Sequence, residues 1–217
     1  MEADNIGDKH VWIVFITYVV VSYVLSLRGN EGLLLDLSGL NQFWSRNDGT
    51  YFIIALLGKI KGENVDRRHL IPCSNVTSSG IEVKVIVDRL RVAKRAVGFK
   101  DGPAISDIKG DIVSSSDLDG LLFSLLEDLF EEQNVLFPPE IKTILDIKER
   151  YHSSRTWRRT ADTRAIEMNV SDKDIDVVNR WKQVESAKGK RLNQPMKQHY
   201  AQLELLLAPF KRYAHAM

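Results

Sequence analysis

An almost continuous apolar run near the N-terminus constrains the fold of this chain more than any other feature. It extends from Val11 to Leu27 and reads VWIVFITYVVVSYVLSL. The run has seventeen residues, which is at the short limit for a membrane-spanning helix, and it contains several hydroxyl groups. The residues before it are acidic, unlike the basic start of a signal peptide. We therefore expect residues 9–27 to form a fully buried core helix, with a membrane-associated helix as the alternative.

The composition suits one globular domain. The chain has 217 residues, of which 44% are hydrophobic, and this is enough to build a core. Cys73 is the only cysteine, which excludes an intrachain disulfide and a cysteine-rich zinc site. A reducing compartment fits this composition.

Charge is distributed unevenly, although the net charge is only +1. Residues 1–100 carry 13 Lys and Arg against 10 Asp and Glu, residues 101–141 carry 1 against 10, and residues 142–217 carry 16 against 9. Local charge determines where a protein can bind a polyanion. The basic C-terminal part is therefore a candidate phosphate-binding surface or a solvated helix face, and the acidic middle is expected to face away from any DNA.

Periodicity and breaker residues predict a mainly α fold with one small antiparallel β-sheet, in the α+β class. The stretches 50–58 and 69–73 are rich in β-branched and aromatic residues and read as a hairpin. Ser116 and Asp117 can cap one helix, and Pro138 and Pro139 can open the next. The helices expected after the hairpin cover residues 83–98, 117–133, 138–152, 155–168, 172–183 and 195–208.

The usual catalytic signatures are absent from the sequence. It contains no glycine-rich phosphate loop, no HExxH, no GxSxG and no paired-cysteine metal spacing. It has instead an excess of arginines in apolar helical contexts, with tyrosines nearby. Guanidinium groups hold a phosphate and stabilise its transition-state charge, while a tyrosine hydroxyl can act as the nucleophile. This combination favours phosphodiester chemistry.

The segment LSLRGNEGLLLDL, residues 25–37, resembles the first conserved box of the tyrosine recombinases, the phage-integrase family. In that box an arginine follows a buried helix and a glutamate follows three residues later. Arg28 and Glu31 match these positions. The resemblance implies that Arg28 contacts the scissile phosphate and that Glu31 supports the fold around it. The alternative role of Arg28 is to interact with the C-terminal dipole of the preceding helix.

The family next has a β-hairpin whose lysine protonates the departing 5′ oxygen. GKIKGENVDRRHLIP, residues 58–72, fits this place. Lys61 is the first candidate and Lys59 the second, because neighbours that alternate in direction cannot both point at one phosphate.

The segment RTWRRTADTRAIEMNV, residues 155–170, is similar to the second box, a His-x-x-Arg motif at the start of a helix. Arg155 stands where the family usually has histidine, and Arg158 matches the second catalytic arginine. The i, i+3 spacing predicts that both lie on one helix face. Because arginine is a poor base, the acceptor of the proton from the nucleophile is open. The pair His152 and Arg155 offers a second register.

The last boxes lie near the C-terminus. DIDVVNRWK resembles the segment that ends in a phosphate-contacting histidine or tryptophan, which places Trp181 there as a donor. PMKQHYAQLELLLAPFKRY contains two candidate nucleophiles, Tyr200, which we choose, and Tyr213. This ending is similar to that of a divergent branch among integrase-like genes of eukaryotic mobile elements.

The resemblance implies a site-specific DNA recombinase or integrase. Such an enzyme cuts and rejoins DNA through a 3′-phosphotyrosyl intermediate, without metal or other cofactor, on double-stranded DNA and as a dimer or tetramer. We expect residues 1–217 to be a single catalytic domain without the family's N-terminal clamp domain. The location expected is the nucleus in a eukaryote and otherwise the cytoplasm, as a soluble protein.

Two rival hypotheses come from other functional classes. The first is a catalytically degenerate DNA-binding relic or regulator with the same fold. The second is a membrane-associated protein that uses residues 11–27.

Overall fold

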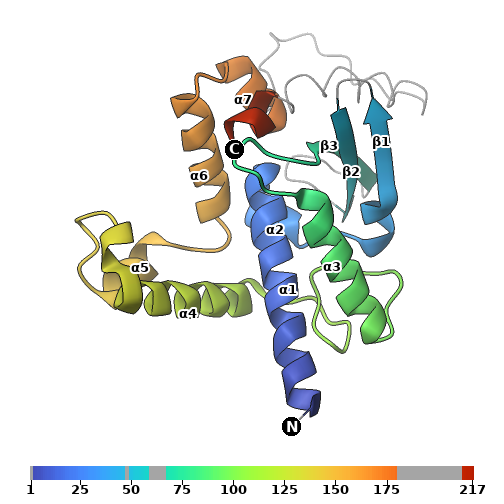
Figure 1. The fold of residues 1–217 in the computed structure, drawn as a ribbon, viewed down its shortest axis with the longest axis horizontal. Helices are drawn as coiled ribbons and strands as arrows, with labels where there is room; N and C mark the ends of the chain where they lie inside the picture. The colour runs from blue at the N-terminus through green and yellow to red at the C-terminus, as the bar shows by residue number, and fades with distance from the viewer. Residues whose placement is uncertain (1, 47–48, 59–66, 180–211) are drawn as a thin grey trace.

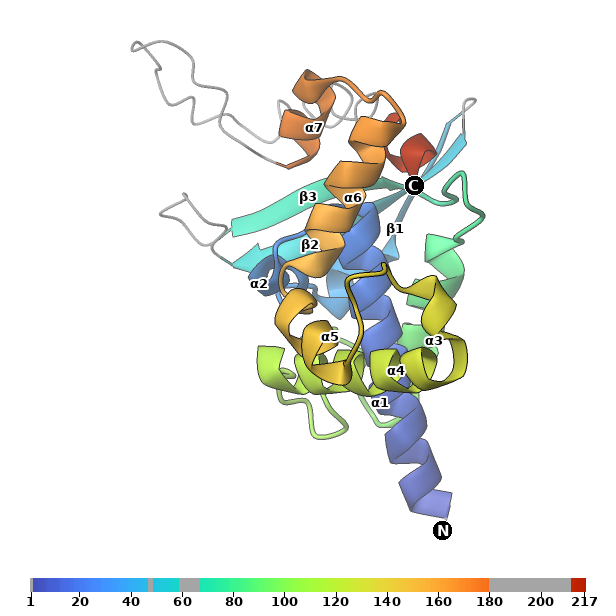
Figure 2. The same ribbon diagram turned by 90° about the vertical axis from the view of Figure 1, so that its left-hand side faces the viewer.

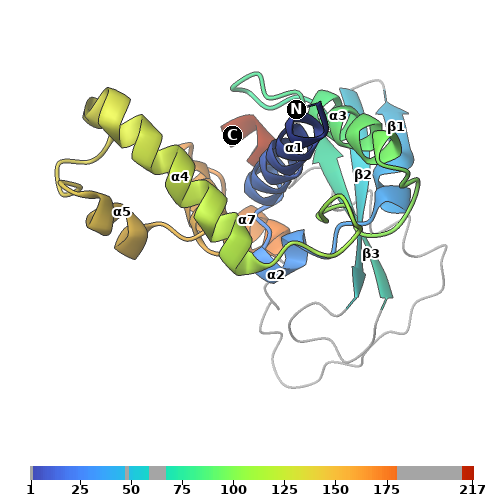
Figure 3. The same cartoon turned by 90° about the horizontal axis from the view of Figure 1, so that it is seen from below.

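The computed structural model describes residues 2–46, 49–58, 67–179 and 212–217, and these form a helix-rich fold with one small sheet (Figure 1). This confirms the prediction of a mainly helical protein. Helix α1 (Glu2–Val24) is the central element and contacts α3 (Val83–Ala96) and α6 (Thr156–Glu167). The sheet and α3 lie on one side of α1, and α4, α5 and α6 lie on the other (Figures 1 and 3).

The apolar run forms a helix as predicted, but it is not buried all round. Phe15, Tyr18 and Val21 are buried, whereas Trp12 is 37% exposed and Ile16 is 47% exposed. The first half of α1 extends past its neighbours toward the N-terminus (Figure 2), and Val11 and Trp12 in this half are exposed. In the described part of the chain, no helix combines the length and the hydropathy that crossing a membrane requires.

The sheet has three antiparallel strands in the order β1-β2-β3. The predicted hairpin is confirmed, because β2 (Gly49–Gly58) pairs with β3 (Arg67–Ser74) from Gly58 opposite Arg67 to Tyr51 opposite Ser74. Strand β1 (Gln42–Arg46) was not predicted. It pairs with the start of β2, with Arg46 opposite Gly49. The signal for it was the Asn-Asp-Gly sequence between two aromatic stretches, which is typical of a tight hairpin.

Helices α4 (Ser115–Gln133) and α5 (Ile144–Arg150) correct the predicted starting points. Ser114, and not Ser116, caps α4, and its side chain accepts a hydrogen bond from the backbone N–H of Asp117. The proline pair 138–139 does not open α5. That helix begins after Thr143, whose hydroxyl and the Asp146 carboxylate form a capping box. The local cap therefore prevails over the N1 preference of proline.

The remaining elements complete the core. The core side chains come from α1, α3, α4, α6, α7 (Asp172–Val178) and β3, and from connecting segments such as those of Leu35 and Ile105. Residues 212–216 are again helical, and Tyr213 also belongs to the core. The predicted helix 195–208 lies outside the described residues. The short elements are α2 (Gly29–Gly32), η1 (Leu37–Asn41) and η2 (Asn134–Leu136). Fully buried core residues include Val21, Leu25, Val87, Leu90, Ala161 and Val178.

Candidate functional site

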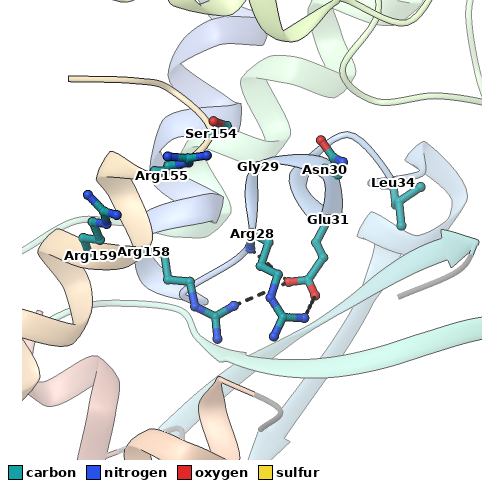
Figure 4. A pocket seen from close by; sticks show the side chains of 9 residues that line it. All are labelled: Arg28, Gly29, Asn30, Glu31, Leu34, Ser154, Arg155, Arg158 and Arg159. Carbon is teal, nitrogen blue, oxygen red and sulfur yellow. Dashed lines mark hydrogen bonds and ion pairs between the residues drawn. The ribbon is translucent and has the colours of Figure 1, made fainter. Parts of the chain in front are cut away.

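A pocket with a volume of about 580 Å³ lies where α2 meets the start of α6 (Figure 4). Two segments far apart in the sequence line it, residues 28–34 and residues 154–159. Four of its side chains are arginines, against a single carboxylate. The lining residues are Arg28, Gly29, Asn30, Glu31, Leu34, Ser154, Arg155, Arg158 and Arg159.

Glu31 lies between two of these arginines. Its Oε1 atom is 3.3 Å from Nη1 of Arg28, and its Oε2 atom is 4.0 Å from Nη1 of Arg158. Oε2 also accepts a hydrogen bond of 2.9 Å from the backbone N–H of Arg28. The Glu31 side chain is 4% exposed, that of Arg158 12% and that of Arg28 30%. The carboxylate is therefore the most deeply buried of these three groups, and of its two arginine partners Arg28 is the more open to a ligand.

Close backbone packing brings the two segments together. The N–H of Gly29 donates a hydrogen bond of 3.0 Å to the carbonyl oxygen of Ser154. A Cβ atom on Gly29 would lie 2.4 Å from Cβ of Ser154, so only glycine permits this approach. The Tyr18 hydroxyl, from α1, donates toward the carbonyl oxygens of Ser153 at 3.2 Å and Gly29 at 3.4 Å. Helix α1 is thus hydrogen-bonded to both of the segments that line the pocket.

The predicted arginines of the two boxes, Arg28, Arg155 and Arg158, line this one pocket. Arg155 is the N-cap of α6 with φ −127° and ψ −31°, so it precedes the first helical residue. The predicted common helix face does not apply to it, although its side chain reaches the same pocket as that of Arg158 (Figure 4). Arg28 is the N-cap of α2, four residues beyond Val24 where α1 ends, and its side chain pairs with Glu31.

Arg159 also lines the pocket and was not predicted. The signal for it was the arginine doublet at 158–159 in the second box. Successive residues at the first turn of a helix point in different directions, so sequence spacing alone did not indicate that both would reach one pocket.

The other predicted site residues lie outside the described residues. These are Lys61 with its alternative Lys59, which follow β2, and also Trp181 and Tyr200. The hairpin itself, which would carry the lysine, is described up to Gly58.

Tyr213, the alternative nucleophile, is fully buried. Its hydroxyl donates a hydrogen bond of 2.8 Å to Oδ1 of Asp162, and burial raises the pKa of Tyr213 above its ordinary value. His152, from the second register, does not line the pocket. Its Nδ1 lies 3.8 Å from Oδ2 of Asp119, and its ring meets Phe123 edge-on.

This arrangement is suited to binding an anion with several oxygens. Planar guanidinium groups present N–H donors in a fixed geometry that matches phosphate oxygens, and their charge persists at every physiological pH. The described residues contain no group of three or more side chains that could hold a metal ion.

The chain was compared with protein-family models, with curated proteins and with solved structures, and none of the three comparisons gave a match.

Proposed function

We propose that this chain is the catalytic domain of a tyrosine recombinase, which cuts and rejoins double-stranded DNA through a 3′-phosphotyrosyl intermediate. The observation that carries the proposal is the convergence of Arg28 and Arg158 on Glu31. The two arginines come from segments that resemble the two arginine boxes of that family. Their meeting in one pocket was not implied by the spacing of either segment.

In the proposed reaction the arginines hold the non-bridging oxygens of the scissile phosphate. Tyr200 then attacks phosphorus, and the bond from phosphorus to the 5′ oxygen breaks. The departing oxygen takes a proton from Lys61, and the tyrosine proton passes to solvent because residue 155 is not a histidine. Return attack by a 5′ hydroxyl on the phosphotyrosyl bond rejoins the DNA. Two or four copies on DNA would exchange strands in this way.

The burial of Tyr213 supports Tyr200 as the nucleophile. A hydroxyl that is enclosed in the core and bonded to Asp162 is not positioned to reach a DNA phosphate. Tyr200 lies closer to Trp181 in the sequence, in the order that the family resemblance implies.

A suicide substrate tests the proposal. The purified protein is incubated, with EDTA present, with duplex DNA that carries a nick near each candidate cleavage position, and a denaturing gel detects a covalent adduct. At a saturating concentration of DNA, we expect an adduct with the native chain and with Tyr213→Phe, and none with Tyr200→Phe. A folded protein that forms no adduct over a library of nicked substrates would contradict the enzyme proposal.

A second candidate function, DNA binding without turnover, is favoured by one observation. Within the described residues, the pocket is lined by four arginines and contains no histidine to accept the nucleophile's proton. A relic of this kind would bind duplex DNA through the pocket, and its affinity would be unchanged in Tyr200→Phe. The same gel, run beside a binding titration, separates the two functions.

A further inference from the structure

A buried polar network lies beneath the arginine pocket and is centred on Asp162 of α6. Its Oδ1 atom accepts hydrogen bonds from the Tyr213 hydroxyl at 2.8 Å, from Asn179 Nδ2 at 3.0 Å and from the Ser26 hydroxyl at 3.0 Å. The Ser26 hydroxyl also lies 2.6 Å from Oδ1 of Asn179. Ser26, Asn179 and Tyr213 are all fully buried. Four segments of the chain therefore meet at one carboxylate.

This network reaches the pocket at two points. The carbonyl oxygen of Asn179 accepts a hydrogen bond of 2.9 Å from Nη2 of Arg158. Ser26 precedes Arg28 by two residues and has a φ of 48°, which is unusual for a residue other than glycine. Its side-chain contacts hold that backbone conformation, and the conformation sets the direction in which the chain leaves α1 toward Arg28.

The C-terminus completes the network. Tyr213 inserts its ring into the core, and Ala214, Ala216 and Met217 beside it are also buried. Arg212 forms a bidentate ion pair with Asp174 of α7, with distances of 2.6 and 2.7 Å. Residues 212–217 are therefore attached to α6 by the hydrogen bond from Tyr213 to Asp162 and to α7 by the ion pair of Arg212 with Asp174. The buried apolar side chains of this segment add packing contacts.

We propose that Tyr213 is a positioning residue of the arginine pocket, so that binding of a DNA phosphate depends on the docked C-terminal residues 212–217. The Tyr213 hydroxyl donates a hydrogen bond to Asp162, and Asp162 in turn accepts hydrogen bonds from Asn179 and Ser26. Asn179 then positions Arg158 through its carbonyl oxygen. Ser26 positions Arg28 through the backbone that joins them. This inference rests on the proposed function, because it concerns phosphate binding by the same pocket.

The first test compares Tyr213→Phe with Tyr23→Phe. Both variants remove one phenolic hydroxyl from the full chain, but Tyr23 is only partly buried, on α1, and lies outside the network. Affinity for a short fluorescein-labelled duplex of mixed sequence is measured over a range of salt concentrations. We expect Tyr213→Phe to bind about five- to tenfold more weakly, as for the loss of one buried hydrogen bond. The slope of log affinity against log salt should also become shallower by about one contact.

Circular dichroism at the binding temperature shows whether each variant is still folded when its DNA affinity is measured. A variant that is merely less stable, but still folded at that temperature, would keep both the affinity and the salt slope of the native chain. That outcome for Tyr213→Phe would overturn the proposal, as would an equal loss in Tyr23→Phe.

A double-mutant cycle with Ser26→Ala provides the second test. If one network positions both arginines, the double variant should bind DNA about as weakly as the weaker single variant, because each change already releases the shared carboxylate. If the fold-losses in DNA affinity of the two single variants multiply in the double variant, the two residues act independently and the common network is contradicted.

Arg158→Gln distinguishes failure of the inference from failure of the proposed function. If Arg158→Gln weakens DNA binding and Tyr213→Phe does not, the positioning role alone is wrong. If Arg158→Gln binds DNA as the native chain does, the pocket does not bind DNA and both proposals fall.

Discussion

The Nη1 atom of Arg158 lies 4.0 Å from Oε2 of Glu31, although α6 and α2 belong to distant parts of the sequence. Glu31 is almost fully enclosed, and it also receives the side chain and the backbone N–H of Arg28. One carboxylate thus offsets the repulsion between two guanidinium groups and sets their separation. An incoming phosphate would find the pair already in place.

Replacing Glu31 by glutamine should lower the free energy of unfolding, and added phosphate should then restore part of the lost stability. The amide keeps the shape but removes the charge, so we expect a loss of about 1–3 kcal/mol, or several degrees in Tm. Inorganic phosphate should restore more of the Tm in Glu31→Gln than in the native chain, relative to chloride at equal ionic strength. The control is Glu167→Gln, because Glu167 pairs with Arg164 on the exposed face of α6. An unchanged Tm in Glu31→Gln would count against the carboxylate's role.

Two arginines of the same helix should differ in their effect on DNA binding. Arg158→Gln should weaken binding of duplex DNA at least tenfold and reduce the salt slope by about one, because a phosphate contact is lost. Arg164→Gln removes the same charge from an exposed site that does not line the pocket. Fluorescence anisotropy at several salt concentrations measures both effects. Equal losses in the two variants would indicate a diffuse basic surface in place of a defined pocket.

Gly29→Ala should destabilise the protein by about 1–3 kcal/mol, since the added methyl group would overlap Ser154. Gly120→Ala is the matched substitution. Gly120 lies on an exposed face of α4 with no atom within 4 Å of the added Cβ, so alanine should stabilise the helix by up to about 1 kcal/mol. Urea unfolding of the two variants checks the opposite signs, and the same sign in both would contradict the close packing of α2 on residue 154.

Because of Lys94, the free energy of unfolding should depend on pH in the alkaline range. Lys94 is fully buried, its Nζ donates to the carbonyl oxygen and hydroxyl of Ser106, and desolvation lowers its pKa from 10.5 to about 8. Between pH 8 and 10.5 the unfolded chain holds the extra proton, so unfolding becomes harder as pH rises, by up to about 1.4 kcal/mol per pH unit. Below pH 8 both states are charged and the buried charge is a constant cost.

Lys94→Met isolates this effect, because the other titrating groups, including Cys73, are present in both proteins. Unfolding free energies are measured by urea from pH 7 to 10. The native chain should gain stability relative to Lys94→Met above pH 8. A difference that stays constant across this range would show that the ammonium is not desolvated.

Cys73 should be unreactive in the folded protein. The residue is 1% exposed, and burial raises the pKa of the thiol to about 12, so almost no thiolate forms at pH 8. Ellman's reagent should react with it only at the rate of unfolding, and urea should release one thiol per chain. Rapid labelling without denaturant would contradict the buried position of Cys73 in β3.

Local patterns in the sequence predicted several elements well. The apolar run predicted α1, two stretches rich in β-branched and aromatic residues predicted the pairing of β2 with β3, helical spacing predicted α3, and cap residues predicted α4. These predictions succeeded because each depends on residues within a few positions of one another. Strand β1 (Gln42–Arg46) was missed although the Asn-Asp-Gly sequence before β2 is typical of a hairpin, because a five-residue strand has little pattern of its own and is stabilised by pairing with β2. The start of α5 was misplaced because Thr143 and Asp146 outweigh the proline pair.

For the site, the sequence by itself determined which arginines to examine and that they were candidates for holding a phosphate. Tertiary structure alone decided that Arg28 and Arg158 share Glu31, that Arg159 reaches the same pocket, and that Tyr213 is buried against Asp162. The physical reason is that these contacts join residues far apart in the chain. Their energies come from close packing at Gly29 and from hydrogen bonds inside the core, and neither leaves a periodic trace in the sequence.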